Sequence, residues 1–206
     1  KSAAKLLLFF DMSKFFLIKI TIFAEIFENR AKNPLFLVKN AKIMKKVLGL
    51  GNALTDILLQ VSEGDLREIG FPKGSMNLID AAQFERLQSR FISVRKHLVA
   101  GGSASNTVAT IAQLGGKAAF IGKIGSDEVG KFYRDDLMKN NVHPLLLTSS
   151  LMSGCCIVLI TPDGERTFCT YLGAAADMRA EDIQKEAFVG YDICHVEGYL
   201  VQDHCL

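Results

Sequence analysis

Residues 100–115 read Ala-Gly-Gly-Ser-Ala-Ser-Asn-Thr-Val-Ala-Thr-Ile-Ala-Gln-Leu-Gly. Gly101-Gly102 makes a turn that few side chains tolerate, and apolar residues at helical spacing follow it up to a stop at Gly115. A short apolar run over 118–124 has the length of a strand, and Asp127 then supplies an N-cap for a second helix. The order turn, helix, strand, helix is typical of a parallel α/β sheet, so we predict an α/β fold.

The Gly-Gly turn also offers a place for a ligand. Gly101 and Gly102 have no side chains, so a ligand can approach the backbone, and the helix behind them begins with free N–H groups. Ser103 and Asn106 lie in the first helical turn, where both can present hydrogen-bonding groups. The alternative is a plain strand-to-helix turn in which Ser103 is an ordinary N-cap. Taken alone, the turn favours this alternative.

The composition is that of an ordinary globular protein. The 206 residues are 49% apolar and 22% charged, enough for one good hydrophobic core. A net charge of +2 from scattered lysines gives no nucleic-acid footprint, and the four histidines have no metal-ligand spacing. Five cysteines without CxxC spacing indicate free thiols in a reducing, cytoplasmic compartment. We therefore predict no metal site and no nucleic-acid partner.

Residues 1–43 differ from the rest of the sequence. They have no initiator Met and are rich in Phe, Leu, Ile and Lys. Charged residues interrupt each apolar run before it reaches the roughly 18 residues of a membrane span. A secretory signal over residues 15–23 is the alternative, but Lys19 lies inside it and no small-x-small cleavage site follows. We expect an extension that is not native to the fold, with the folded domain over residues 44–206.

A buried strand that ends in glycine is predicted directly after that boundary, over Val47–Gly51. Asn52 and Asp56 follow it, and we expect both just past its carboxyl end, where open α/β sheets bind ligands. Read alone, both residues are also typical of Asx turns. A dinucleotide site is disfavoured, because the third glycine of Gly-x-Gly-x-x-Gly would fall at Leu54.

Several predicted strands are not followed by helices. They lie at 57–61 and 76–79 and on the two arms of a hairpin, 155–161 and 166–172. Because these strands depart from βαβ alternation, we predict that they form a small separate sheet.

Three further elements are predicted around these strands. Asp80 and Gln83 indicate a capping box at the start of a helix. Residues 177–188 are predicted to be helical, and a strand over 192–196 ends at Glu197. Glu197 is either a solvated loop carboxylate or a ligand at the edge of the sheet. In the hairpin turn, we expect Asp163 only to make the turn soluble.

The residues around the Gly-Gly turn form a longer pattern. It consists of Ala100-Gly-Gly-Ser-Ala-Ser-Asn106, Gln113-Leu-Gly-Gly116, Phe120-Ile-Gly122 and Ile124-Gly-Ser-Asp-Glu-Val-Gly130. This pattern closely resembles the first signature of the ribokinase-like (PfkB) carbohydrate kinases, and the resemblance extends from about Met44 to the end of the sequence. Gly-Gly-Ser, in place of the Gly-Gly-Lys common in ribokinases, resembles the adenosine kinase branch of a family that also includes fructokinases.

The resemblance implies a fold and a set of ligand residues. The fold would be ribokinase-like, a parallel sheet flanked by helices with a small β-sheet lid over the substrate. Asp56 would accept hydrogen bonds from two substrate hydroxyls, a task that suits the two oxygens of a carboxylate. The resemblance places Arg166 near the acceptor pocket or a phosphate. The predicted substrate-binding residues are Asn52, Asp56, Gly101, Gly102, Ser103, Asn106, Arg166 and Glu197.

The predicted function is ATP-dependent transfer of the γ-phosphate to a hydroxyl of a sugar or nucleoside, with adenosine as the first candidate. In this family ATP and Mg²⁺ require a second signature, Asp-Thr-x-Gly-Ala-Gly-Asp, and an Asn-x-x-Glu motif, and the 206 residues contain neither. We therefore expect a fold that is incomplete at the C-terminus, a catalytic base beyond Leu206, and a chain that is inactive alone.

The alternative is a non-catalytic module of the same fold. Such a module would bind a sugar or nucleoside, or form a homodimer through the lid. The exact substrate stays open at this point, because specificity depends on a few contacts in the pocket.

Overall fold

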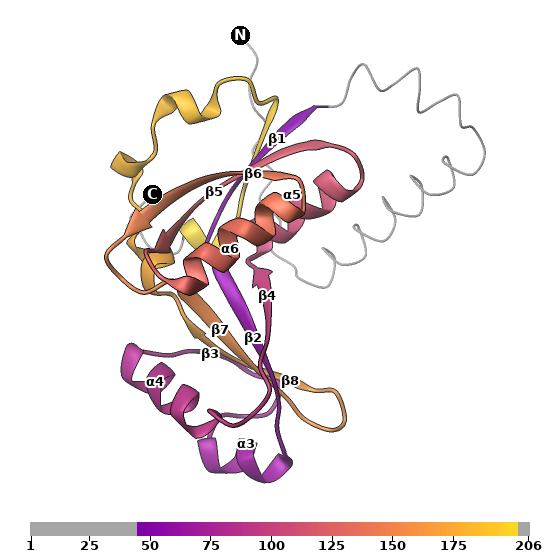
Figure 1. Cartoon of the computed structure of the whole chain (residues 1–206), viewed down its shortest axis with the longest axis vertical. Helices are drawn as coiled ribbons and strands as arrows, with labels where there is room; N and C mark the ends of the chain where they lie inside the picture. The colour runs from indigo at the N-terminus through magenta and orange to yellow at the C-terminus, as the bar shows by residue number, and fades with distance from the viewer. Residues whose placement is uncertain (1–44, 202–206) are drawn as a thin grey trace, which may run out of the picture. The chain divides into compact units, whose positions relative to one another are not determined.

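The structure is a computed structural model that describes residues 45–201. The predictions for residues 1–43, and the boundary after them, lie outside the described residues, as does Cys205. Within the described range the chain forms two β-sheets, one parallel and one mixed (Figure 1).

The alternating strands and helices that were predicted around the Gly-Gly turn belong to the parallel sheet and its covering layer. Its strands lie in the order β6-β5-β1-β9, and every neighbouring pair is parallel. The strands are β1 (Lys46–Leu50), β5 (Lys117–Gly125), β6 (Val142–Ser149) and β9 (Ile193–Val196). Two helices, α5 (Ser103–Gln113) and α6 (Glu128–Lys139), precede β5 and β6. The predicted α/β fold with helices flanking a parallel sheet is confirmed.

The parallel sheet is covered differently on its two faces. On one face, Val108 of α5 and Tyr133 of α6 belong to a buried cluster with Phe120 of β5. On the other face, Leu48 of β1 packs in a second cluster with Met178, which belongs to an irregular segment after the hairpin. The sheet therefore has two hydrophobic layers, only one of which is helical.

The predicted helix over 177–188 is wrong. The segment consists of short 3₁₀ turns, η2 (Gly173–Asp177), η3 (Ala180–Asp182) and η4 (Lys185–Phe188). Lys123 of β5 accounts for the break, because its Nζ donates to the backbone oxygen of Asp177 (2.8 Å) and to Oδ2 of Asp182 (2.8 Å). A backbone carbonyl that is bonded to the sheet in this way is drawn out of a helical ladder, so a tertiary contact overrides the local pattern.

The strands that departed from βαβ alternation form the second sheet, which we call the lid sheet. Its order is β3-β8-β7-β2-β4, with both parallel and antiparallel neighbours. The strands are β2 (Leu54–Gln60), β3 (Met76–Leu78), β4 (His97–Gly101), β7 (Gly154–Ile160) and β8 (Arg166–Tyr171). The small separate sheet was predicted, but β4 was not assigned to it.

Two helices cover one face of the lid sheet (Figure 1). They are α3 (Glu63–Ile69) and α4 (Ala81–Arg90). Side chains of alternate strand residues, such as Ile57 and Ile157, pack with Phe84 of α4 into a buried cluster. The predicted capping box is confirmed, since Gln83 N donates to Asp80 Oδ1 (2.7 Å) and Asp80 N to Gln83 Oε1 (3.0 Å).

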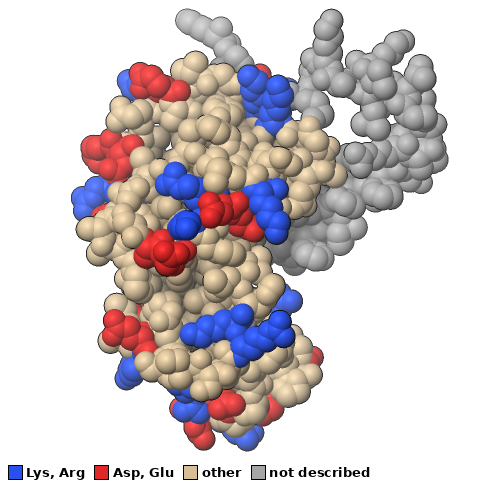
Figure 2. Space-filling model, in the orientation of Figure 1, with Lys and Arg blue, Asp and Glu red and all other residues tan. Residues whose placement is uncertain are grey.

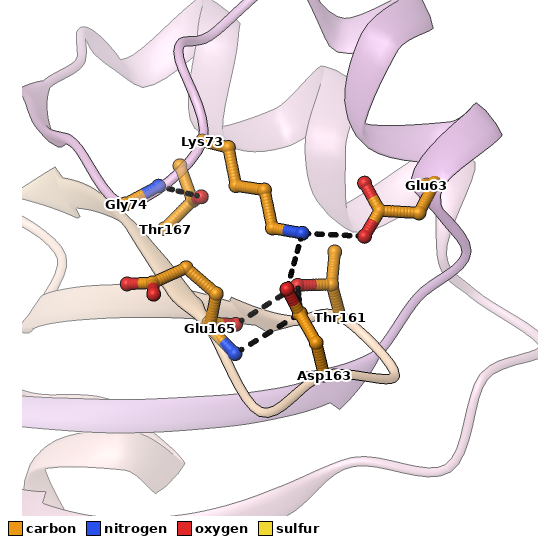
Figure 3. Close-up of polar contacts among 7 residues, drawn as sticks. All are labelled: Glu63, Lys73, Gly74, Thr161, Asp163, Glu165 and Thr167. Atoms are coloured by element: carbon orange, nitrogen blue, oxygen red, sulfur yellow. Dashed lines mark hydrogen bonds and ion pairs between the residues drawn. The ribbon is translucent and has the colours of Figure 1, made fainter.

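The turn between β7 and β8 is attached to the rest of the lid by Lys73 (Figure 3). Its Nζ lies 2.7 Å from Oδ2 of Asp163 and also contacts Glu63 of α3. Asp163 further accepts a hydrogen bond from Oγ1 of Thr161 at 2.7 Å. The bond from Lys73 is the main cause that lowers the pKa of Asp163 to about 2. Asp163 therefore links the hairpin to α3 instead of only making the turn soluble.

Candidate functional site

A pocket of about 610 Å³ lies where the lid sheet meets the carboxyl ends of β1 and β9 and the N-terminus of α5. One part of its lining is polar and consists of Asn52, Asp56, Gly102, Ser103, Asn106 and Glu197. Most of the rest is apolar and includes Leu54, Met76, Leu78, Phe168, Leu172, Ala175, Met178 and Leu200. The structure thus brings six of the eight predicted site residues together in one cavity.

Gly101 and Gly102 allow the chain to pass close to two other segments. A Cβ on Gly101 would lie 2.8 Å from Oδ1 of Asp56, and one on Gly102 would lie 2.4 Å from the backbone oxygen of Asn52. Gly102 also has a φ of +93°, which disfavours other residues. Gly101 does not line the pocket. It gives Asp56 room, and its carbonyl accepts a hydrogen bond from the hydroxyl of Tyr133 at 3.1 Å.

Ser103 is the first residue of α5, so the alternative that made it the N-cap is wrong. Gly102 occupies the N-cap position and has no side chain to donate or accept. The hydroxyl of Ser103 instead donates to Oε2 of Glu197 at 3.1 Å. Asn106, one turn further on, is exposed and lines the pocket. The helix therefore begins at the pocket with side chains of Ser103 and Asn106 beside it.

Asp56 does not lie just past the end of the first strand, as predicted. It lies within β2, where its cross-strand neighbours are Cys156 of β7 and Val99 of β4. The prediction failed because the chain needs only Gly51–Ala53 to pass from β1 into the lid sheet. Burial raises the pKa of the Asp56 carboxyl to about 6, while the positive charge of Arg166 acts in the opposite direction.

Arg166 is not among the residues that line the pocket. It begins β8 and is exposed, two residues before Phe168, which does line the pocket. Its influence on the site is electrostatic, through the carboxyl of Asp56. A direct role of Arg166 toward a substrate or phosphate stays a prediction.

Glu197 is buried, with 3% of its surface exposed, so the alternative of a solvated loop carboxylate is wrong. It directly follows β9, and its backbone N–H donates to the oxygen of Leu50 at 3.1 Å. Its Oε1 accepts from the backbone N (2.7 Å) and from Nδ2 (2.6 Å) of Asn52. Its Oε2 accepts from Ser103 and from the backbone N of Ala104 (3.3 Å).

The apolar wall of the pocket was missed by the sequence analysis. Phe168 and Leu172 come from β8 and the residue after it, and Ala175 comes from η2. The alternation of side chains along β8 was a usable signal, because Phe168, Thr170 and Leu172 share one face of a strand. No local pattern indicated that η2 would contribute Ala175, since that depends on how the segment after β8 folds.

Metal-binding groups, membrane-spanning helices and surface charge bear on the cofactors and partners that the chain could bind. Within residues 45–201, no group of three or more His, Cys, Asp or Glu side chains could hold a metal ion. In the same range no helix is long and apolar enough to cross a bilayer. On the face shown in Figure 2, basic and acidic side chains are interspersed. We therefore assign no metal ligand and no transfer step to residues 45–201.

Comparison with known proteins places this site in a family. The sequence profile of the pfkB family carbohydrate kinases matches residues 74–206. The solved structure of adenosine kinase from Sinorhizobium meliloti is similar, with a TM-score of 0.68 and 36% identity over 77% of this chain and 48% of that one.

Curated sequences are similar over shorter stretches. Probable fructokinase-5 of Arabidopsis thaliana is 34% identical over 110 residues, which are 51% of this chain and 34% of that protein. Aminoimidazole riboside kinase of Salmonella typhimurium is 43% identical over 74 residues, 35% of this chain and 23% of that protein. The chain thus spans no more than about half the length of these relatives. The profile match, which covers more than half of the sequence and includes the Gly-Gly turn, shows that the chain belongs to the pfkB family of carbohydrate kinases.

Proposed function

We propose that residues 44–206 form the acceptor-binding part of an ATP-dependent kinase that phosphorylates a hydroxyl of a nucleoside, with adenosine as the first candidate. Family membership supports a sugar or nucleoside kinase, and the pocket supports the narrower choice. The observation that carries the proposal is the division of the pocket into a polar and a large apolar part.

A nucleoside matches this division. Its ribose carries hydroxyls at one end of the molecule, and its flat base is largely apolar on both faces. Asp56, Asn52 and Asn106 could bind the hydroxyls, while Leu54, Leu78 and Phe168 would pack on the base. A free sugar has hydroxyls on most of its carbons and would leave the apolar wall without a partner.

Asp56 is the residue that we expect to contribute most to acceptor binding. With a pKa of about 6, its carboxyl is mainly ionised at pH 7 and can accept hydrogen bonds through both oxygens. Bonds to an ionised acceptor are the stronger ones, and partial burial strengthens them further.

Fructose or a related sugar is the second candidate substrate. The observation in its favour is the group of plant fructokinases among the curated relatives, such as Fructokinase-2 of Zea mays at 39% identity over 80 residues. These matches cover about a quarter of that protein, so they leave most of its length uncompared.

ATP and Mg²⁺ are the expected cofactors, because the proposed reaction needs a nucleotide and a metal ion. Neither of the two motifs expected to hold them occurs in the 206 residues. We therefore propose that this chain alone binds the acceptor and transfers phosphate poorly or not at all. The cytoplasmic location stays a prediction.

A non-catalytic dimer through the lid is the other arrangement to test. One face of the lid sheet is covered by α3 and α4, and the other lines the pocket. A lid dimer would therefore have to use the outer strands β3 and β4 or close the pocket. This observation makes a nucleoside-binding kinase part the better proposal.

The test is equilibrium binding of adenosine, ribose and fructose to the purified chain and to Asp56→Ala. Asp135→Ala, which removes an exposed carboxylate of α6, is the matched control. We expect adenosine to bind best, and Asp56→Ala to weaken it by about 2–5 kcal/mol, the scale for removing a charged hydrogen-bonding partner. Tighter binding of fructose than of adenosine, or equal affinities of the two variants, would contradict the proposal.

A further inference from the structure

We infer that Glu197 is a positioning residue that fixes two of the chain connections between the parallel sheet and the lid sheet, β1 to β2 and β4 to α5, and thereby sets the geometry of the acceptor pocket. The inference rests on the proposed function for its binding consequences. Its structural part concerns only the hydrogen bonds of one carboxylate.

The first connection leads out of the parallel sheet. Residues 51–53 join β1 to β2, and Asn52 is the middle one. Both its backbone N–H and its side-chain amide donate to Oε1 of Glu197, at 2.7 and 2.6 Å. Asn52 is itself buried, so these two donors depend on a protein acceptor. Glu197 therefore holds the outgoing connection by backbone and side chain together.

The second connection leads back from the lid sheet. β4 ends at Gly101, and α5 begins at Ser103. Oε2 of Glu197 accepts from the hydroxyl of Ser103 (3.1 Å) and from the N–H of Ala104 (3.3 Å). Because Gly102 cannot cap α5 with a side chain, a carboxylate 93 residues further along the chain takes over the capping of Ala104.

The neighbouring backbone leaves space for this carboxylate. A Cβ on Gly51 would lie 2.4 Å from Oε2 of Glu197, a distance that a side chain cannot adopt without displacing the carboxylate. Gly51 itself donates to the backbone oxygen of Ile121 (3.2 Å), so it is held in place and cannot easily move aside. The absence of a side chain at Gly51 is thus a requirement of the Glu197 contacts.

The hydrogen-bond count separates positioning from ligand binding. An ionised carboxylate has about four acceptor sites, and Glu197 accepts four hydrogen bonds from the protein. A substrate hydroxyl would have to displace one of these donors. Asp56, by contrast, accepts no comparable set of hydrogen bonds from residues 45–201 and remains the better candidate for binding the substrate. Glu197 acts on the substrate through Asn52 and Ser103, which it orients.

The first experiment needs no ligand. Residue-resolved amide exchange is measured by NMR on the chain and on Glu197→Gln, with Glu186→Gln as a matched control at an exposed carboxylate. The amide NH₂ of Gln cannot accept from the donors on its side, so one or both connections lose bonds. We expect exchange about tenfold faster at Asn52, at Ala104 or at both, with protection kept in the lid core at Ile157. Unchanged exchange at both amides, or a uniform rise over residues 45–201, would overturn the inference.

The second experiment distinguishes positioning from contact. Affinities of Glu197→Gln and the original chain are compared for adenosine and for its 2′-, 3′- and 5′-deoxy analogues. If Glu197 only positions its neighbours, Glu197→Gln should weaken the binding of all four nucleosides by the same factor, about tenfold. If Glu197 contacts a substrate hydroxyl directly, Glu197→Gln should leave the affinity for the analogue that lacks this hydroxyl unchanged. That result would overturn the inference.

The role of Glu197 can be tested even if Glu197→Gln does not fold or the chain binds no nucleoside. If Glu197→Gln fails to fold, Gly51→Ala tests the same contacts, because the added Cβ displaces the carboxylate. Amide exchange at Asn52 and Ala104 should rise in Gly51→Ala too, and no rise would count against the positioning role of Glu197. If the original chain binds none of the nucleosides, the proposed function fails while the exchange result still decides the role of Glu197.

Discussion

The lid sheet and the parallel sheet differ in how their apolar side chains are covered. The lid sheet carries its own helices on one face and leaves the other to the pocket. The parallel sheet has helices on one face and an irregular segment on the other, and its strand β9 exposes 43% of Ile193 and 46% of Val196. Parallel sheets are usually buried on both faces. The lid sheet thus has a helical layer of its own but exposes Met76 (65%) and Leu78 (72%) at its edge strand β3, whereas the parallel sheet exposes apolar side chains at its edge strand β9, where we expect association.

The largest expected effects test whether the two sheets are independent units. Phe84→Ala removes a ring from the lid cluster, and Phe120→Ala removes one from the helical face of the parallel sheet. Both side chains are essentially unexposed, so each change should lower the free energy of unfolding by about 3–5 kcal/mol. Amide exchange should rise only in the lid for Phe84→Ala. Equal loss of protection in both sheets would mean that they unfold as one unit.

An intermediate effect is expected at Asp56, where the lid serves binding at the expense of stability. Its pKa is raised from 3.8 to about 6, so between these values the folded chain keeps a proton that the unfolded chain releases. The free energy of unfolding therefore falls as the pH rises through this range and stays lower above it. Asp56→Asn should be more stable by about 1–2 kcal/mol at pH 7, allowing for solvent screening, and no more stable near pH 4.

Denaturant unfolding at several pH values measures this difference, with Asp135→Asn as the control. The same variant should lose adenosine affinity. A stability gain that is independent of pH would show that the charge of Asp56 is not its source.

The smallest change in stability is expected at the exposed edge of the parallel sheet. Ile193→Lys with Val196→Lys should alter the free energy of unfolding by no more than about 0.5 kcal/mol per site. Self-association measured by sedimentation should nevertheless decrease, because lysines on an edge strand oppose pairing. Ile92→Lys, at a residue that is 75% exposed and follows α4, is the control and should leave self-association unchanged. Equal behaviour of the two variants would show that β9 is not the associating surface.

Local signals in the sequence were sufficient to predict those elements whose structure depends on neighbouring residues. Asp80 and Asp127 cap helices as predicted, because an N-cap needs only the next turn of backbone. The hairpin around Gly164, with its φ of +84°, also followed from turn chemistry. The helix α3 was not predicted, although Ser62 and Asp65 form a capping box of the same kind as Asp80 and Gln83.

Structural features that depend on residues far apart in the sequence could not be predicted from such local signals. The segment 177–188 lost its helix to Lys123, more than 50 residues earlier in the chain. The residues Asn52, Gly102, Ser103 and Asn106 were identified because they stand in one short motif or directly after a strand. The choice between a solvated and a buried Glu197 was left open because its four hydrogen-bond donors come from residues 93 to 145 positions away.

The connection 51–53 also limits which insertions and deletions this chain could tolerate during divergence. Its three residues are all buried, so an added residue has no space in which to bulge and would shift β2 along its neighbours. A shift by one residue exchanges the two faces of a strand, which would turn Asp56 into the apolar cluster under α3 and α4 and bring Thr55 to the pocket. Length changes of one residue at this connection should therefore be absent among functional variants, whereas the exposed turn at Gly164 has room to accept them.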